Sequence, residues 1–412
     1  MIAYLLRVLV LASIVVSVAI AAEPIRIALI EPFSGPFANI GTESLHAFQS
    51  EFDRINANGG VLDRHFEIIA LDNKSSPQEA TLQVQFAIDQ GIRYILQGAG
   101  SNVGHAISDA VAKFNARNPA RPVLYLNHAA LDPALTTEKC HFWHFRFVPN
   151  GDMILAALTD ALARDARIKR VYLINQDYVW GQSVARNAKA MLKQKRPDVE
   201  IVGEDLHPIG KVKDFAPYVA KMGATHADAI ITGNWGNDLA LLIRSVKDSG
   251  LPLEVYAPLA GLQGAAAAMG ASGADRVRAV LFWHSNVEND FLLKNAQDFK
   301  AKYGQDWSWL PNYLTPELLS IAMQRAQSIE PTQVALALEG LRMEGPTGPL
   351  WMRAEDHQLM LPVFQTVFTR AGGPDVRYDA ENTGFGWKTE GKVAADENVP
   401  LVTCRVQRPK SQ

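Results

Sequence analysis

Apolar and polar residues alternate along the first third of the chain with two different periods. Short apolar runs predict buried strands at residues 25–30, 66–71, 94–96 and 123–126. Between these runs, apolar residues recur at every third or fourth position, which predicts helices at 42–56, 77–90 and 103–116. Gly59 and Gly60 are expected to end the first of these helices. The pattern is a series of β-α units.

The same alternation resumes after residue 170. It predicts strands at 171–175, 199–206, 229–232 and 253–257, and helices at 181–195, 215–222 and 238–249. Repeated β-α units favour parallel sheets with helices on both faces. Because two such runs are separated by an irregular segment, we expect an α/β fold with two doubly wound lobes joined by a hinge.

The connections between the runs set the expected domain boundaries. The aromatic-rich segment 140–150 is the expected first crossing between lobes, and 275–282 is the expected return before helices at 291–303 and 316–329. Lobe 1 then comprises residues 23–147 with 277–358, and lobe 2 comprises 148–276 with 359–372. The polar, irregular residues 373–412 are expected to form a C-terminal tail packed on the lobes.

The N-terminus has a different pattern. Arg7 precedes an apolar run at residues 8–19, and Ala19-Ile20-Ala21 has the small-x-small spacing that signal peptidase reads. The run is short for a membrane span. We expect residues 1–22 to be a cleaved signal peptide, with an uncleaved anchor as the alternative.

Export gives meaning to the two cysteines of the chain, Cys140 and Cys404. Disulfides persist in oxidising compartments and are rare elsewhere. We expect Cys140 and Cys404 to form one long-range disulfide, and two unpaired buried thiols are the alternative.

Composition and motifs exclude several classes of function. The 412 residues are 48% hydrophobic and 20% charged, with a formal net charge of −3, which is typical of a soluble globular protein and offers no basic face for nucleic acid. The run from Gly98 has Val103 at the third glycine position of a dinucleotide fingerprint, so no cofactor is expected. His141 and His144 would point to opposite faces of a strand, so no metal site is expected. Catalytic motifs with a nucleophile and a base are absent from the sequence, and an enzyme is the least favoured class.

Loops after the predicted strands carry the remaining chemistry. In doubly wound sheets the loops at the carboxyl ends of the strands line the ligand crevice. Here these loops hold the aromatic residues Phe33, Phe37, Tyr178, Trp180 and Trp235, with few polar groups. Trp180 and Trp235 stand out because each lies beyond a strand, before a helix and next to a glycine. Core packing is the alternative role for each of these aromatic residues.

Together with the export signal and the two lobes, a set of short motifs resembles a known family. The motifs are Ser34-Gly35-Pro36, residues 55–60, Asp72, Gly91-Ile92, Ala130 with Pro133, Leu135 and Thr136, Phe145-Arg146, Gly181 and Gly348-Pro349-Leu350. The chain resembles the solute-binding receptors of bacterial ABC importers, in the branched-chain amino acid-binding branch of the type I periplasmic binding proteins. The resemblance implies a Venus flytrap fold in the periplasm, a ligand held between lobes by hinge closure, and docking on membrane permease subunits. It implies no catalysis, and we expect a monomer. A receptor ectodomain for ligand sensing is the nearest rival.

The resemblance also implies where the ligand binds. The family serine that holds the ligand carboxylate matches Ser101, whose helix start would suit an anion. An alanine carbonyl and a threonine of the family fall at Ala129 and Leu131, so the threonine hydroxyl is missing here. The family glutamate that pairs with the α-ammonium falls at Leu259, in a loop from 257 to 268 without Asp or Glu.

These departures lead to an expected ligand. Two tyrosine positions of the family fall at Trp180 and Trp235, which offer flat apolar walls. We expect a receptor for a hydrophobic carboxylate, aromatic by preference; a receptor for branched-chain amino acids or small amides is the alternative. The expected ligand-binding residues are Phe37, Ser101, Asn102, His128, Ala129, Leu131, Tyr178, Trp180, Asn234, Trp235 and Leu259.

Overall fold

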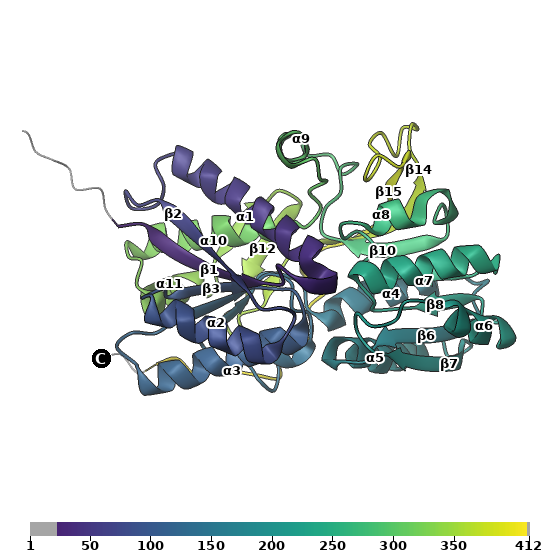
Figure 1. Ribbon diagram of the computed structural model, residues 1–412, viewed down its shortest axis with the longest axis horizontal. Helices are drawn as coiled ribbons and strands as arrows, with labels where there is room; N and C mark the ends of the chain where they lie inside the picture. The colour runs from purple at the N-terminus through teal and green to yellow at the C-terminus, as the bar shows by residue number, and fades with distance from the viewer. Residues whose placement is uncertain (1–22, 410–412) are drawn as a thin grey trace, which may run out of the picture.

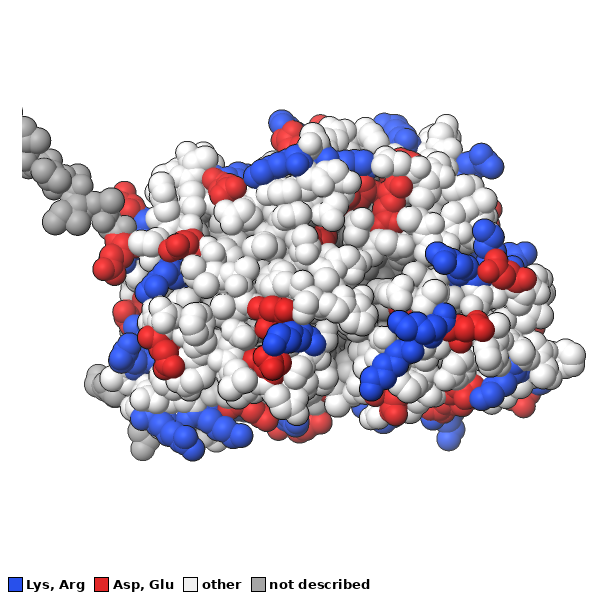
Figure 2. Space-filling view, viewed as in Figure 1, with Lys and Arg blue, Asp and Glu red and all other residues white. Residues whose placement is uncertain are grey.

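A computed structural model describes residues 23–409 of the chain as two α/β lobes lying side by side (Figure 1). The expected signal peptide, residues 1–22, lies outside the described residues. Among the helices at 23–409, none combines the length and apolar character that a membrane crossing requires. Positive and negative side chains are interspersed over the face shown in Figure 2, as the nearly balanced composition predicts.

Lobe 1 is built on a parallel sheet in the order β2-β1-β3-β4-β5. Its strands are β1 (Ile25–Glu31), β2 (Phe66–Asp72), β3 (Tyr94–Gln97), β4 (Leu124–Asn127) and β5 (His144–Arg146). The helices α2 (Pro77–Asp89) and α3 (Ser101–Arg117) cover one face of the sheet. The opposite face packs against α1 (Ala38–Ala57), which contacts α10 (Pro311–Ala326); α9 (Asp290–Tyr303) lies against α1, and α11 (Pro331–Leu338) lies against α10. Central strands are buried on both sides, which explains their short, continuous apolar runs.

Lobe 2 is built on a seven-stranded sheet in the order β15-β14-β10-β9-β8-β6-β7. Its strands are β6 (Arg170–Gln176), β7 (Glu200–His207), β8 (Ala229–Ile231), β9 (Glu254–Tyr256), β10 (Val277–Leu281), β14 (Val363–Arg370) and β15 (Phe385–Val393). The helices are α4 (Gly151–Ala163), α5 (Val179–Lys195), α6 (Ala216–Ala224), α7 (Gly236–Ser249) and α8 (Ala265–Met269). The strands from β6 to β10 are parallel, and β14 and β15 add an antiparallel edge.

The boundary expected at residue 277 needs correction, because β10 lies inside the second sheet, between β9 and β14. Arg278 interrupts the apolar run of this strand and made it resemble a connection. Its guanidinium is half-buried at the sheet, where it forms ion pairs with Glu254 at 2.7 Å and Glu390 at 3.0 Å. The chain therefore returns to lobe 1 after β10, and it crosses again between β13 (Leu359–Met360) and β14.

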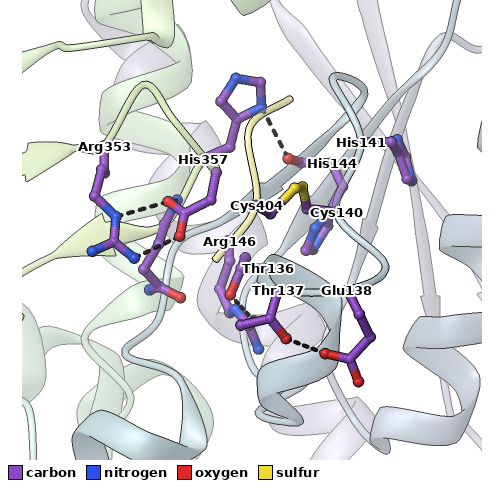
Figure 3. Close-up of a disulfide and its surroundings, with 12 residues drawn as sticks. Thr136, Thr137, Glu138, Cys140, His141, His144, Arg146, Arg353, His357 and Cys404 are labelled. Carbon is purple, nitrogen blue, oxygen red and sulfur yellow. Dashed lines mark hydrogen bonds and ion pairs between the residues drawn. A yellow bond between two sulfur atoms is a disulfide. The ribbon is translucent and has the colours of Figure 1, made fainter. Parts of the chain in front are cut away.

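The C-terminal region is also more regular than expected. β15 pairs with β14 along its whole length, and its residues Phe385 and Trp387 are buried in the lobe 2 core. Beyond β15 the chain runs back to lobe 1, where the backbone N–H of Val406 donates to the carbonyl of Glu355 at 2.8 Å. A disulfide joins Cys404 of this segment to Cys140, with their Cα atoms 6.4 Å apart (Figure 3). A small antiparallel sheet of β11 (Arg342–Gly345), β12 (Gly348–Met352) and β13 comes between the return to lobe 1 and the next crossing, and Arg353 and His357, which follow β12, are drawn in the surroundings of the disulfide in Figure 3.

Candidate functional site

The loops at the carboxyl ends of the strands of both lobes line a small cavity, the position expected for a ligand site in doubly wound sheets. Lobe 1 contributes Ile40, Glu43 and Ser44 of α1, Ala99, Gly100 and Ser101 at the start of α3, His128, Ala129 and Leu131 after β4, and Trp309 before α10. Lobe 2 contributes Tyr178, Trp180, Trp235, Leu259 and Leu262. The site therefore lies between the lobes, with both walls in place.

Most of the residues expected at the site are brought together in this cavity. Those that line it are Ser101, His128, Ala129, Leu131, Tyr178, Trp180, Trp235 and Leu259. Three others do not line it. Phe37 packs against Trp235 with ring centroids 4.2 Å apart and ring planes tilted by 31°, so it forms a contact between the lobes at the edge of the site. Asn234 is turned away, and its side-chain oxygen lies 3.1 Å from Nε2 of His207. Asn102 follows Ser101 in the first turn of α3, but its side chain lies outside the cavity wall.

Ser101 is prepared to bind a negatively charged group. Its side chain is 2% exposed, and its hydroxyl oxygen accepts the backbone N–H groups of Leu131 at 3.2 Å and Asp132 at 3.1 Å. Both bonds occupy lone pairs, so the O–H of Ser101 remains able to donate. The first N–H groups of α3 also have no intrahelical acceptor. The start of α3 thus offers several donors and the positive end of a helix dipole to a carboxylate.

Glycine allows the loops of lobe 1 to approach one another at this place. A Cβ atom on Gly98 would lie 2.6 Å from the Cβ of Ala129, and Gly100 has φ +88°. Side chains at these positions would push the loops after β3 and β4 apart or strain the backbone. The two glycines therefore serve to place α3 against the loop after β4.

Glu31 and His128 form a buried pair beneath these loops. The carboxylate of Glu31 is fully buried; it accepts the N–H of Gly98 at 2.7 Å and lies 2.7 Å from Nε2 of His128. The sequence led us to expect His128 as a ligand contact, and the structure places it in the cavity wall, but its partner Glu31 was missed. A glutamate that ends a buried apolar strand was the available signal for Glu31, because a charge at such a position is rarely left unpaired.

Glu43 is a second carboxyl group that sequence reasoning missed. It lies in α1, is 5% exposed and lines the cavity, and its Oε1 has no hydrogen-bond partner among the described residues. Burial, with a smaller contribution from the negative charge of Glu31, raises the pKa of Glu43 to about 8. The sequence did contain a signal for Glu43: this carboxylate falls on the same helical stripe as Ile40, Ala47 and other apolar residues of α1, so burial could have been expected.

The wall from lobe 2 is apolar, and its few polar atoms are already paired. The indole N–H of Trp180 donates to the carbonyl of Gly233 at 2.8 Å, and the indole N–H of Trp235 donates to the Tyr178 hydroxyl at 2.8 Å. These bonds fix both indoles, which are buried at 1% and 6% exposure and line the cavity. Leu259, the residue that we aligned with the family glutamate, lies in the same wall.

The histidines considered for a metal are engaged elsewhere. Nε2 of His141 lies 2.8 Å from the Ser108 hydroxyl, and burial lowers the pKa of His141 to about 4. Nε2 of His144 lies 3.2 Å from the Asn127 side-chain amide. Within residues 23–409, no group of three or more His, Cys, Asp or Glu side chains is arranged to hold a metal ion.

Comparisons with known proteins agree with this architecture. Residues 24–373 match the family model described as periplasmic binding protein. Leu/Ile/Val-binding protein homolog 4 of Brucella abortus (strain 2308) is 33% identical over 404 residues, covering 94% of each chain. A solved structure of the leucine-, isoleucine-, valine-, threonine- and alanine-binding protein from Brucella ovis, in a closed conformation, has 32% identity and a TM-score of 0.83. It covers 94% of this chain and 100% of that chain.

A more distant structure shares the fold alone. It is a solute-binding protein of an ABC transporter from R. palustris in complex with benzoate, with 18% identity and a TM-score of 0.74, covering 84% of this chain and 93% of that chain. The two-lobed α/β architecture with its central cavity, together with the match over residues 24–373, identifies the family. This chain belongs to the periplasmic binding protein family and is a solute-binding protein of an ABC transporter, with the type I fold.

Proposed function

We propose that this protein is the periplasmic receptor of an ABC importer for a hydrophobic carboxylate, aromatic by preference, which it holds between its lobes and delivers to membrane permease subunits. The observation that carries the proposal is the contrast between the polar lobe 1 wall around Ser101 and the apolar lobe 2 wall opposite it. The start of α3 offers donors for a carboxylate, while Trp180, Trp235 and Leu259 of the opposite wall are apolar.

The surroundings of Ser101 argue against an ordinary amino acid. In an α-amino acid the ammonium group lies next to the carboxylate, so it would be close to Ser101, Ala129 and Leu131. The lobe 2 wall that closes over this region carries no carboxylate at Leu259 or at the other residues that line it. Burying an unpaired ammonium costs several kcal/mol, which corresponds to about 10³-fold in affinity.

A receptor for branched-chain amino acids is the second candidate. It is favoured by the relative at 33% identity, whose name is Leu/Ile/Val-binding protein homolog 4. The buried carboxyl of Glu43 also lies in the cavity wall and could approach an ammonium group in a different ligand orientation.

Isothermal titration of ligand-stripped protein decides between the two. We expect benzoate or a phenylpropanoid acid to bind more tightly than leucine, isoleucine or valine. Submicromolar binding of leucine, with no binding of any aromatic acid, would contradict the proposal and establish the second candidate.

A further inference from the structure

Three buried carboxyl groups lie on or beside α1, and they differ in how their oxygens are satisfied. Glu51 is 5% exposed, and one of its oxygens lies 3.0 Å from Nε of Arg54. Glu31 is fully buried, and it is bonded by backbone N–H groups and His128. Glu43 is as buried as Glu51, yet its Oε1 has no partner. A buried polar atom without a partner is costly, so Glu43 requires an explanation.

The cavity supplies that explanation, because Glu43 is the one of the three carboxyl groups that lines it. An incoming ligand can therefore complete the hydrogen bonding of Glu43, whereas the fold already satisfies Glu51 and Glu31. Ser44, the next residue of α1, lines the cavity as well. Two adjacent polar residues thus interrupt a wall that Ile40 and Trp309 otherwise make apolar.

Glu43 and Ser101 lie in different parts of the lobe 1 wall. Ser101 is bonded to the backbone of Leu131 and Asp132, on the β4 side of the start of α3. Glu43 lies on α1, where the negative charge of Glu31, at the end of β1, acts on it. Both side chains line the same cavity from different elements, so a ligand whose carboxylate meets Ser101 can meet Glu43 with another polar group.

We propose that Glu43 determines specificity by accepting a hydrogen bond from a hydroxyl or amino group that the ligand carries on its body, apart from its carboxylate. This inference rests on the proposed function and adds the second polar group of the ligand. A neutral carboxyl accepts through its carbonyl oxygen and donates through its O–H, so a hydroxyl group can satisfy both. An amino group can satisfy the acceptor, and a cationic one would favour the ionised form.

Two pairs of acids that differ by one terminal hydroxyl test the inference. Isothermal titration compares benzoate with 4-hydroxybenzoate, and 3-phenylpropanoate with 3-(4-hydroxyphenyl)propanoate, on full-length mature protein stripped of ligand. In the wild type we expect the hydroxylated acid of at least one pair to bind at least about tenfold more tightly, which is the size of one hydrogen bond. The variant Glu43→Leu should reduce this preference to within about twofold, and Glu43→Gln, which keeps a carbonyl acceptor, should retain part of it.

The control is Glu51→Gln, which alters an equally buried carboxyl of the same helix outside the cavity. It should leave the preference for the hydroxylated acid unchanged, and thermal unfolding verifies that each variant is folded. Equal affinities within both pairs for the wild type, or a preference that survives in Glu43→Leu, would overturn the inference while the proposed function stands. If no aromatic acid binds the wild type, the proposed function fails and this inference is withdrawn with it.

Discussion

The two walls of the cavity are built from different chemistry. The lobe 1 wall contains Glu43, Ser44, Ser101 and His128, and the start of α3 adds free backbone N–H groups. The lobe 2 wall consists of two tryptophans, two leucines and Tyr178, whose hydroxyl already accepts an indole N–H. From this difference we expect the two lobes to have different roles, which we call the division of labour between the walls: lobe 1 recognises polar groups of the ligand, and lobe 2 closes over its apolar body.

The largest expected effect comes from removing the aromatic surface of lobe 2. Trp235→Ala deletes a ring that is 6% exposed and lies between the cavity and Phe37. Truncating a buried aromatic anchor costs about 2–4 kcal/mol of binding energy, or about 30- to 1,000-fold in affinity. Titration calorimetry with the tightest aromatic acid measures the loss.

Trp351→Ala is the matched control, because Trp351 lies in β12 and outside the cavity wall. It should leave the dissociation constant unchanged. Equal losses in the two variants would mean that the effect is general destabilisation and that the apolar wall does not bind the ligand.

A smaller loss is expected from the polar wall. Ser101→Ala removes the O–H that we expect to donate to the ligand carboxylate, and hydrogen bonds to charged groups contribute about 1.5–3 kcal/mol, or about 10- to 100-fold. Ser108→Ala is a close control, because Ser108 is equally buried in the same helix, bonds to His141 and does not line the cavity. If both variants bind with wild-type affinity, the carboxylate is held elsewhere.

Sequence patterns predicted the fold well because they are local. Each of the predicted strands and helices named above is set by periodicity within a few residues, and the β-α alternation then determines the two parallel sheets. β10 was misplaced for an equally local reason, since Arg278 breaks its apolar run while its ion-pair partners Glu254 and Glu390 are distant in sequence.

The site was harder to predict, because it depends on which residues meet across the lobes. Phe37 has the side chain and the chain position of a ligand contact, but its ring packs against Trp235 of the other lobe. Glu43 is the converse case. It lies in the middle of a helix rather than at a strand end, and it reaches the cavity only because α1 packs beside the loop after β4. Neither outcome can be obtained from spacing along the chain.

The buried carboxyl of the polar wall should also make stability depend on pH. Burial raises the pKa of Glu43 from 4.5 to about 8, so the folded state holds a proton that the unfolded state releases between these values. The stability of the wild type should therefore decrease as the pH rises from about 5 to 8.5, relative to Glu43→Gln, which does not titrate. The charge that acts on Glu43, that of Glu31, is the same in both proteins.

Thermal unfolding of ligand-free wild type and Glu43→Gln at both pH values measures this difference. One pKa unit corresponds to about 1.4 kcal/mol. The gap in unfolding free energy, taken as wild type minus Glu43→Gln, should therefore fall by at least about 2 kcal/mol from the lower to the higher pH. A gap that stays constant with pH would show that Glu43 is ionised in the folded protein, and that a cation or water stabilises its charge.

The smallest effect on the cavity is expected from the disulfide, which lies in lobe 1 and away from both walls. Cys140 precedes β5, and Cys404 belongs to the segment that returns from β15, where Arg408 also forms an ion pair with Glu339 at 2.7 Å. The bond should therefore hold the C-terminal segment on lobe 1 without shaping the ligand contacts. Thiol titration of the denatured, unreduced protein should find no free thiol, whereas two per chain would contradict the bond.

The double variant Cys140→Ser/Cys404→Ser should bind the ligand within about twofold of the wild type but expose the C-terminal segment to proteolysis, because ordered termini resist cleavage only while they are tied down. A large loss of affinity in this variant would mean that the C-terminal segment helps to set the closure of the lobes, and the division of labour between the two walls would then have to include it.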